Sequence, residues 1–214
     1  MTLSGARLWF ETSPLRHGLL LGLFALSAAV ILSASHSMTA ATIALRLSED
    51  RMASLRQVIP EALHDNDVSA TVLEVDDLHE GLVVFHVATL EEEVSAIAVE
   101  VTSFGYAGGI NVLIGVSADG TVLGARVLSH AETPGLGDKI ERRKSDWIDS
   151  FAGTSLRNPA PEGWGVKKDG GVFDQFSGAS ITPRAVVQAV ERGLHLFERN
   201  RTDILNAFSP EGRT

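Results

Sequence analysis

The sequence Asp174-Gln-Phe-Ser-Gly-Ala-Ser180 runs directly into Ile181-Thr-Pro183 and then into an amphipathic stretch. Thr182 is a good N-cap and Pro183 a favoured first helical residue, so the pattern predicts a helix that begins there. Ser180 then lies just before a helix N-terminus, where unpaired N–H groups and the helix dipole attract phosphate. The small residues beside it leave room for a bulky reagent. Two interpretations stay open: a loop that only caps a helix, or a site for a phosphate-bearing cofactor, including a covalent one.

Strand signals dominate the middle of the chain. Five runs rich in Val, Ile and Thr are predicted strands, and Asp119-Gly120 between the last two is a strong hairpin signal. Amphipathic spacing predicts helices over Lys139–Phe151 and Pro183–Arg199. Because strands and helices segregate rather than alternate, the expected fold class is α+β. The predicted strands are Val68–Val75, Leu82–Leu90, Val94–Thr102, Ile110–Ser117 and Thr121–Leu128.

The N-terminal part contains a candidate membrane span. No Asp, Glu, Lys or Arg occurs from Gly18 to Leu45, and a spanning helix needs about 20 apolar residues. Arg7 and Arg16 precede this stretch, so the positive-inside rule predicts a cytoplasmic N-terminus and an exported remainder. A cleaved signal peptide is the alternative, because the apolar core is short and small residues follow it. We favour an uncleaved anchor.

A second helix is expected between the span and the strands. Apolar residues from 48 to 64 recur at helical spacing, Ser48 with two acidic residues after it is a start signal, and Pro60 kinks or ends the helix. We therefore predict four segments: a cytoplasmic N-terminus (1–17), a transmembrane helix (18–40), a linker helix (41–66) and one extracytoplasmic domain (67–214).

The composition excludes several classes of cofactor and partner. The chain has 214 residues and no cysteine, which excludes disulfides, Cys-ligated iron–sulfur clusters and the c-type haem attachment motif within it. Its net charge of −9 argues against nucleic acid, which binds through Lys and Arg. The histidines show no metal-ligand spacing, so no metal site is assigned. Any electron carrier in this chain is therefore expected to be an organic cofactor.

Three blocks of the sequence resemble the FMN-binding domain family. They are Asp174–Ser180, Glu132-Thr-Pro-Gly-Leu-Gly-Asp-Lys-Ile140 and Trp164-Gly-Val-Lys-Lys-Asp-Gly-Gly-Val-Phe-Asp-Gln-Phe176. Together they resemble the G subunits of Rnf (Rsx) electron transport complexes and, more distantly, the C subunits of sodium-pumping NADH:quinone reductases. The resemblance implies an FMN whose phosphate is esterified to the last hydroxyl of the first block. That residue is usually threonine and here is Ser180; the chemistry needs only a hydroxyl, and Thr182 is a fallback acceptor.

The resemblance also assigns cofactor contacts. The loop after the last strand is expected to lie along the isoalloxazine ring, with Leu136 as an apolar face and Glu132 as a polar group near the ring edge. Two adjacent lysines, Lys167 and Lys168, are either solvated or near the phosphate, and we prefer Lys168 as the phosphate contact. Arg184 is either a partner of the phosphate or a solvent-exposed side chain. His130, the histidine nearest the loop, has no assigned role. The expected cofactor-binding residues are Glu132, Thr133, Leu136, Gly137, Lys168, Ser177, Gly178, Ala179, Ser180 and Thr182.

The function implied by the resemblance is electron transfer in a membrane complex. The chain is expected in the bacterial inner membrane, its flavin domain periplasmic, carrying electrons through covalent FMN between ferredoxin and NAD with other subunits. It would have no catalytic residue of its own. A separate flavin transferase would read the motif from Asp174 and attach FMN from FAD with magnesium; otherwise Asp174 is only a turn residue. The alternatives are a stand-alone extracytoplasmic flavin-dependent reductase and a non-redox assembly protein.

Overall fold

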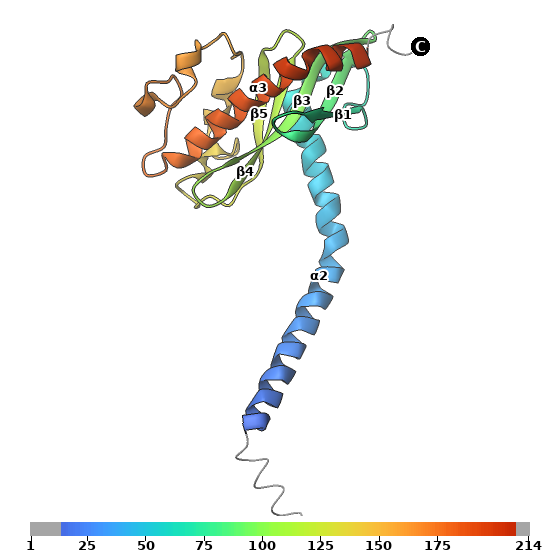
Figure 1. Ribbon diagram of the computed structural model, residues 1–214, viewed down its shortest axis with the longest axis vertical. Coiled ribbons are helices and arrows are strands. Elements are labelled where there is room, and N and C mark those ends of the chain that lie inside the picture. The colour runs from blue at the N-terminus through green and yellow to red at the C-terminus, as the bar shows by residue number, and fades with distance from the viewer. Residues whose placement is uncertain (1–13, 209–214) are drawn as a thin grey trace, which may run out of the picture. The chain divides into compact units, whose positions relative to one another are not determined.

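The computed structural model describes residues 14–208, which divide into two units between Glu49 and Asp50. Both units contain part of α2 (Pro14–Val58), a continuous helix of 45 residues (Figure 1). Its first part exposes apolar side chains, and among the described residues it is the one helix long and apolar enough to cross a membrane. The predicted span over 18–40 lies within it.

The expected start of a second helix at Ser48 is wrong. α2 passes through Ser48 without interruption, because helix-forming residues flank it and an N-cap residue alone does not break such a run. Pro60 acts as predicted. The helix ends at Val58, since the residue before a proline disfavours the α conformation. A short 3-10 helix, η1 (Glu61–Leu63), follows.

Five strands form one antiparallel sheet in chain order. They are β1 (Val72–Asp77), β2 (Gly81–Leu90), β3 (Glu93–Phe104), β4 (Gly109–Ser117) and β5 (Val122–Ser129). The last four match the prediction, and the Asp119-Gly120 hairpin is confirmed. β1 begins later than the predicted Val68 because Asp67 organises a turn. Its carboxylate accepts the N–H of Ser69 at 3.0 Å, and its carbonyl oxygen accepts the N–H of Thr71 at 3.0 Å.

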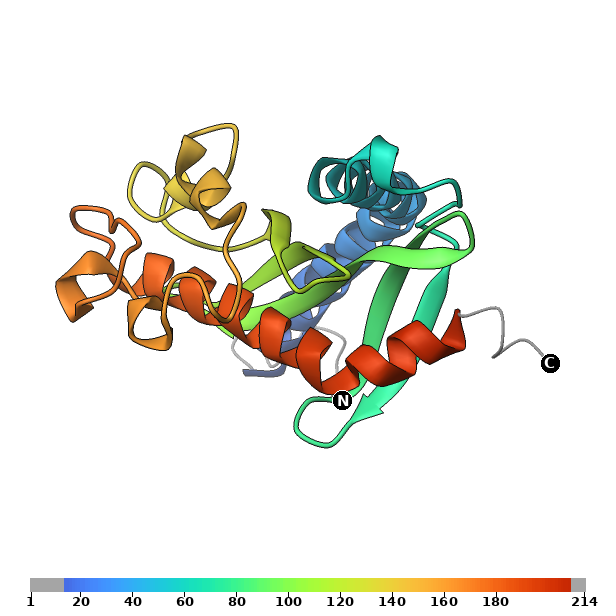
Figure 2. The ribbon, with the colours of Figure 1, turned by 90° about the horizontal axis from the view of Figure 1, so that it is seen from above.

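Each face of the sheet is covered by a helix. α3 (Ile181–Ala207) packs on one face, and the last turns of α2 pack on the other (Figure 2). Side chains of β3 alternate accordingly, with Ile97 buried on the α3 side and Ala98 buried against α2. The second contact is close, since a Cβ on Gly115 would lie 2.2 Å from the carbonyl oxygen of Val58. Glycine at this position lets α2 reach the sheet.

Between Ser129 and Ser180, a stretch the structure describes in full, the chain forms no α-helix. It forms four 3-10 helices: η2 (Asp138–Ile140), η3 (Asp146–Phe151), η4 (Pro161–Gly163) and η5 (Lys167–Asp169). The predicted helix over Lys139–Phe151 is therefore wrong. Ser145 interrupts it, because its backbone is extended and its hydroxyl accepts the N–H of Trp147 at 3.2 Å. The large apolar side chains of this stretch are nevertheless buried: Ile140, Trp147, Ile148 and Phe151.

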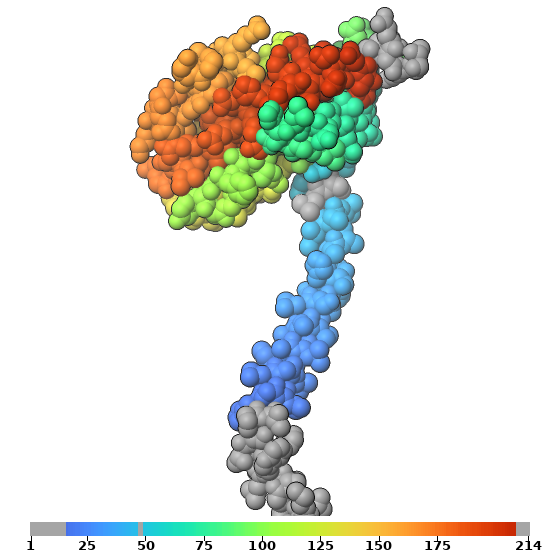
Figure 3. All heavy atoms as spheres, in the orientation of Figure 1, coloured from blue at the N-terminus to red at the C-terminus, as the bar shows by residue number. Residues whose placement is uncertain are grey.

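This irregular segment lies beside the first half of α3 (Figures 2 and 3). Its aromatic side chains make the contact with the core, and the rings of Phe151 and Phe173 stack with centroids 4.6 Å apart. Aromatic packing thus fixes a stretch that has little regular backbone hydrogen bonding.

The turn between β2 and β3 is strained. Glu91 and Glu92 have φ angles of +53° and +68°, which glycine and asparagine adopt more easily. Replacing the pair by Asn-Gly should raise the free energy of unfolding by about 1 kcal/mol. Urea unfolding of the full-length chain in detergent measures the change. Glu93→Gln is the matched control, because it removes a neighbouring charge at a strand position; an equal gain there would assign the effect to charge instead.

Candidate functional site

A pocket of about 280 Å³ opens where the β3–β4 loop, the loop after β5 and the start of α3 meet. Eight of the ten contact residues expected from the sequence line it, together with Tyr106 and Ile181, which were not expected. The signal for Tyr106 is weak, because an aromatic residue among the glycines of 105–109 indicates only a loop. The expected residues in the wall are Glu132, Thr133, Leu136, Gly137, Gly178, Ala179, Ser180 and Thr182.

The start of α3 differs from the prediction. The helix begins at Ile181, so Ser180 is the N-cap and Thr182 is the second helical residue. The assignment of Thr182 as N-cap and Pro183 as first helical residue is therefore wrong. Pro183 is still compatible with the helix as its third residue, because an N–H group in the first turn has no intrahelical partner to lose. The Ser180 side chain makes no capping hydrogen bond, which leaves its hydroxyl and the first amides of α3 available to the pocket.

Glu132 joins the three segments through its carboxylate. The residue is 5% exposed, and its two oxygens accept the N–H of Ala107 at 2.9 Å and the hydroxyl of Thr182. The carboxylate also lies close to Gly137, where a Cβ would come within 2.8 Å of an oxygen. Expected as a polar group at a ring edge, Glu132 in the structure holds the walls of the pocket together.

Thr182 and Ser180 differ sharply in access. Thr182 is fully buried and its hydroxyl donates to Glu132, whereas Ser180 is half-buried on the pocket wall. A reagent that reaches the pocket meets the hydroxyl of Ser180 and not that of Thr182. Of the two hydroxyls, that of Ser180 is therefore the accessible one.

Two of the expected contact residues lie outside the pocket wall. Ser177 is exposed in the turn before α3, and Lys168 is exposed on η5. Arg184 is paired with Asp169, with Nη2 and Oδ1 2.9 Å apart, and this hydrogen bond lowers the pKa of the Asp169 carboxyl. The guanidinium is therefore engaged within the protein. Lys168 makes no ion pair with any residue from 14 to 208.

A side-chain hydrogen bond holds the main chain that leads to Ser180. The indole N–H of Trp147 donates to the carbonyl oxygen of Asp174 at 2.8 Å. The carboxylate of Asp174 pairs with Lys167 at 2.6 Å and is still 69% exposed. Gly178 then turns the chain with φ of +82°, a conformation that favours glycine. The backbone of the motif is therefore held while its first carboxylate stays accessible.

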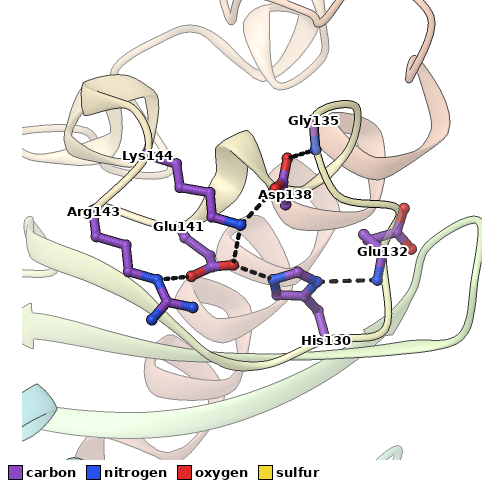
Figure 4. Close-up of polar contacts among 7 residues, drawn as sticks. All are labelled: His130, Glu132, Gly135, Asp138, Glu141, Arg143 and Lys144. Carbon is purple, nitrogen blue, oxygen red and sulfur yellow. Dashed lines mark hydrogen bonds and ion pairs between the residues drawn. The ribbon is translucent and has the colours of Figure 1, made fainter.

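A polar network holds the loop of residues 132–137 (Figure 4). Asp138 accepts the N–H of Gly135 at 2.8 Å and a hydrogen bond from the Lys144 ammonium at 2.5 Å. Lys144 also lies 3.3 Å from a carboxylate oxygen of Glu141. The Lys144 hydrogen bond, followed by that of Gly135, lowers the pKa of Asp138, and Asp138 in turn raises the pKa of Lys144. The turn of the loop is therefore tied to one group of charged side chains.

Comparison with known proteins identifies the family. A family model described as FMN-binding domain matches residues 105–195, which include the whole pocket wall. The G subunit of the ion-translocating oxidoreductase complex of Cereibacter sphaeroides is 56% identical over 205 residues, covering 96% of this chain and 93% of the relative. The G subunit of Stutzerimonas stutzeri is 46% identical over 182 residues, covering 85% and 80%. This chain belongs to the family of G subunits of ion-translocating oxidoreductase complexes.

Two solved structures match part of this chain at low identity. Shewanella oneidensis NqrC is 22% identical, with a TM-score of 0.45 over 68% of this chain and 73% of that one. The C subunit of the Na⁺-translocating NADH-quinone reductase from Parabacteroides distasonis is 21% identical, with a TM-score of 0.43 over 57% and 64%.

The pocket of this G subunit fits the FMN for which its domain family is described. The first amides of α3 suit a phosphate, and the hydroxyl of Ser180 lies beside them. Leu136 and Tyr106, which are 45% and 75% exposed, offer apolar surface in the same wall that suits a flavin ring. Among the described residues no cluster of His, Asp and Glu could hold a metal ion.

The Lys144–Asp138 pair should stabilise the folded domain over a defined pH range. The lowered pKa of Asp138 adds stability above its unfolded pKa of about 3.9, and this is lost as pH falls through the folded pKa. The raised pKa of Lys144 adds stability below about 10.4, and this is lost as pH rises through the folded pKa. We expect the stability difference between wild type and Lys144→Met to be constant from about pH 5 to 9 and to shrink in acid. Urea midpoints across pH measure it; a difference that changes near neutrality would contradict this assignment.

Proposed function

We propose that this chain is the membrane-anchored flavoprotein subunit of its complex and carries electrons through an FMN joined to Ser180 by a phosphoester. Electrons would pass between ferredoxin and NAD through partner subunits. The one candidate span within residues 14–208 has no charged residue from Gly18 to Leu45 and offers no path for ions, so ion movement would belong to other subunits. One observation carries the proposal: the hydroxyl of Ser180 is half-buried, free of capping contacts and on the pocket wall at the N-terminus of α3.

Attachment would be a substitution at phosphorus. The Oγ of Ser180 forms a bond to the FMN phosphorus of FAD, the pyrophosphate bond breaks, and AMP leaves. The hydroxyl proton passes to a base on the flavin transferase, and no atom changes oxidation state. The anchored backbone and exposed carboxylate of Asp174 give that transferase a fixed feature to read. Magnesium supplied with the transferase would neutralise the phosphates.

Bound FMN would supply reversible one- and two-electron chemistry. The residues of this chain bind and orient it: the first amides of α3 can hold the phosphate, and Leu136 and Tyr106 offer apolar surface. Lys168 lies outside the pocket wall and makes no ion pair within residues 14–208, and we propose it as a cation for the phosphate side. A covalent bond matters outside the cytoplasm, because mass action cannot refill an empty site where free FMN is scarce.

Intact mass and peptide mapping of the chain purified from its native membrane test the attachment. We expect one added FMN less one water, flavin fluorescence that persists after denaturation, and a modified peptide that contains Ser180. An unmodified mass with no flavin, or a flavin released on unfolding, would overturn the proposal. Turnover of a soluble acceptor by the purified chain alone would instead favour the stand-alone reductase.

The absence of cysteine makes the topology directly testable. Leu78, which is 98% exposed between β1 and β2, can be replaced by cysteine without loss of packing. We expect Leu78→Cys to react with a membrane-impermeant maleimide added to spheroplasts. The wild-type chain is the unlabelled control. Labelling only after lysis would place the flavin domain in the cytoplasm.

A further inference from the structure

His130 stands between the end of β5 and the loop that lines the pocket (Figure 4). Its Nδ1 accepts the N–H of Glu132 at 3.0 Å, and its Nε2 lies 3.0 Å from a carboxylate oxygen of Glu141. The imidazole is largely enclosed, with 12% of the side chain exposed. A nitrogen that accepts an N–H carries no proton, and a nitrogen that faces a carboxylate donates one. The two contacts therefore specify a neutral ring with its proton on Nε2.

The carboxylate of Glu141 is itself held in place. Arg143 donates to one oxygen, and the ammonium of Lys144 lies 3.3 Å from the oxygen that His130 contacts. Burial acts to raise the pKa of Glu141, but the hydrogen bonds from Arg143, His130 and Lys144 outweigh it and keep the pKa below its usual value. Glu141 is thus a fixed anionic acceptor for the Nε2 proton.

Two points of the pocket loop are attached to this one cluster. His130 holds the main chain of Glu132, and Asp138 holds that of Gly135. Lys144 contacts both Asp138 and Glu141, so the two attachments share one ammonium group. Within the loop, the backbone hydrogen bonds are those from the N–H groups of residues 136 and 137 to the carbonyl oxygen of residue 133. The hydrogen bond to His130 therefore holds the main chain of the first residue of the loop, whose carboxylate is held by Ala107 and Thr182.

We propose that His130 is a positioning residue of the flavin site: its neutral, Nε2-protonated ring fixes the main chain of Glu132 and thereby aims the Glu132 carboxylate at Ala107 and Thr182. The inference rests on the proposed function, that FMN occupies this pocket. A fixed carboxylate in the wall opposes the negative charge that reduction adds to a flavin. Loosening Glu132 eases reduction, so the midpoint potential rises.

Two substitutions of His130 separate its two hydrogen bonds. The amide of Asn lies where Nδ1 lies, so His130→Asn keeps an acceptor for the N–H of Glu132 and loses the contact with Glu141. The amide of Gln reaches the position of Nε2, so His130→Gln keeps the donor to Glu141 and leaves the N–H of Glu132 without an acceptor. Both remove the ring, and Asn is one methylene shorter than Gln, so an effect of packing alone would be at least as large in His130→Asn.

The first readout is redox titration of the full-length flavinylated chain. At a fixed ambient potential we expect His130→Gln to change the ratio of reduced to oxidised flavin about tenfold toward reduced, which is about 30 mV for a two-electron couple. His130→Asn should stay within about twofold of wild type. Equal shifts in the two variants, or none in His130→Gln, would overturn the inference. Covalent flavin is first quantified by mass in each protein, so a wild type without flavin refutes the proposed function and not this positioning role.

The second readout needs no flavin. In the full-length Ser180→Ala chain, ¹⁵N shifts of the His130 ring should show the Nε2-protonated tautomer at neutral pH. Hydrogen exchange at the Glu132 amide should be up to about tenfold faster in His130→Gln than in His130→Asn. A ring protonated on Nδ1, or equal exchange in the two variants, would contradict the positioning role whatever the state of the cofactor.

Discussion

Ser180→Ala is expected to abolish covalent flavin while the domain stays folded. The Ser180 hydroxyl makes no capping hydrogen bond, so its removal breaks no cap and should change stability by less than about 0.5 kcal/mol. Thr182 cannot take over, because it is fully buried and donates to Glu132. The measurement is in-gel flavin fluorescence and intact mass after denaturation, with urea unfolding as the test of folding.

Two matched variants complete this experiment. Ser180→Thr keeps a hydroxyl at the N-cap and should retain the label. Thr182→Val removes the buried hydroxyl and leaves a carboxylate oxygen of Glu132 without its donor, which should cost about 1–2 kcal/mol of stability but leave the label in place. A Ser180→Ala protein whose flavin maps to Thr182 would show that α3 opens during attachment, contrary to the accessibility argued above.

The residues of the pocket wall were more predictable than their local geometry. The glycines and hydroxyls of residues 174–182 indicate a loop at a helix N-terminus, and most of them line the pocket. The cap assignment failed for a non-local reason. Local rules treat the hydroxyls of Ser180 and Thr182 alike, but Glu132, fifty residues earlier in the chain, binds the second one and shifts the helix start to Ile181.

The fold shows the same difference between local signals, which predict elements, and non-local contacts, which change them. Strands β2 to β5 follow from runs rich in Val, Ile and Thr and from a glycine turn, which are local signals. The region 139–151 has a helical pattern of apolar residues, yet it folds as two 3-10 helices. The hydroxyl of Ser145 accepts the N–H of Trp147 and interrupts the helix. The indole N–H of Trp147 then donates to the carbonyl oxygen of Asp174. Tyr106 was not predicted in the pocket wall. The residues next to it in the sequence carry no signal that the loop after β5 lines the same pocket.

Glu132→Ala is expected to destabilise the domain more than any other single change in the pocket. It leaves the buried hydroxyl of Thr182 and the N–H of Ala107 without their acceptor and creates a cavity beside Gly137. Together these effects should lower the free energy of unfolding by about 3 kcal/mol. The urea midpoint of the full-length chain measures the loss, and a change below about 1 kcal/mol would show that water satisfies both donors.

Glu132→Gln separates the charge of this side chain from its shape. Its amide oxygen can still accept from Ala107, and the Thr182 hydroxyl can reverse to accept from the amide nitrogen, so most of the stability should return. The negative charge in the wall is gone, however, and reduction of the bound flavin should become easier. A variant as stable as wild type but with a raised midpoint potential would show that Glu132 acts on the cofactor through its charge. An unchanged potential would leave Glu132 only the role of joining the three walls, because the fixed carboxylate then exerts no measurable field on the ring.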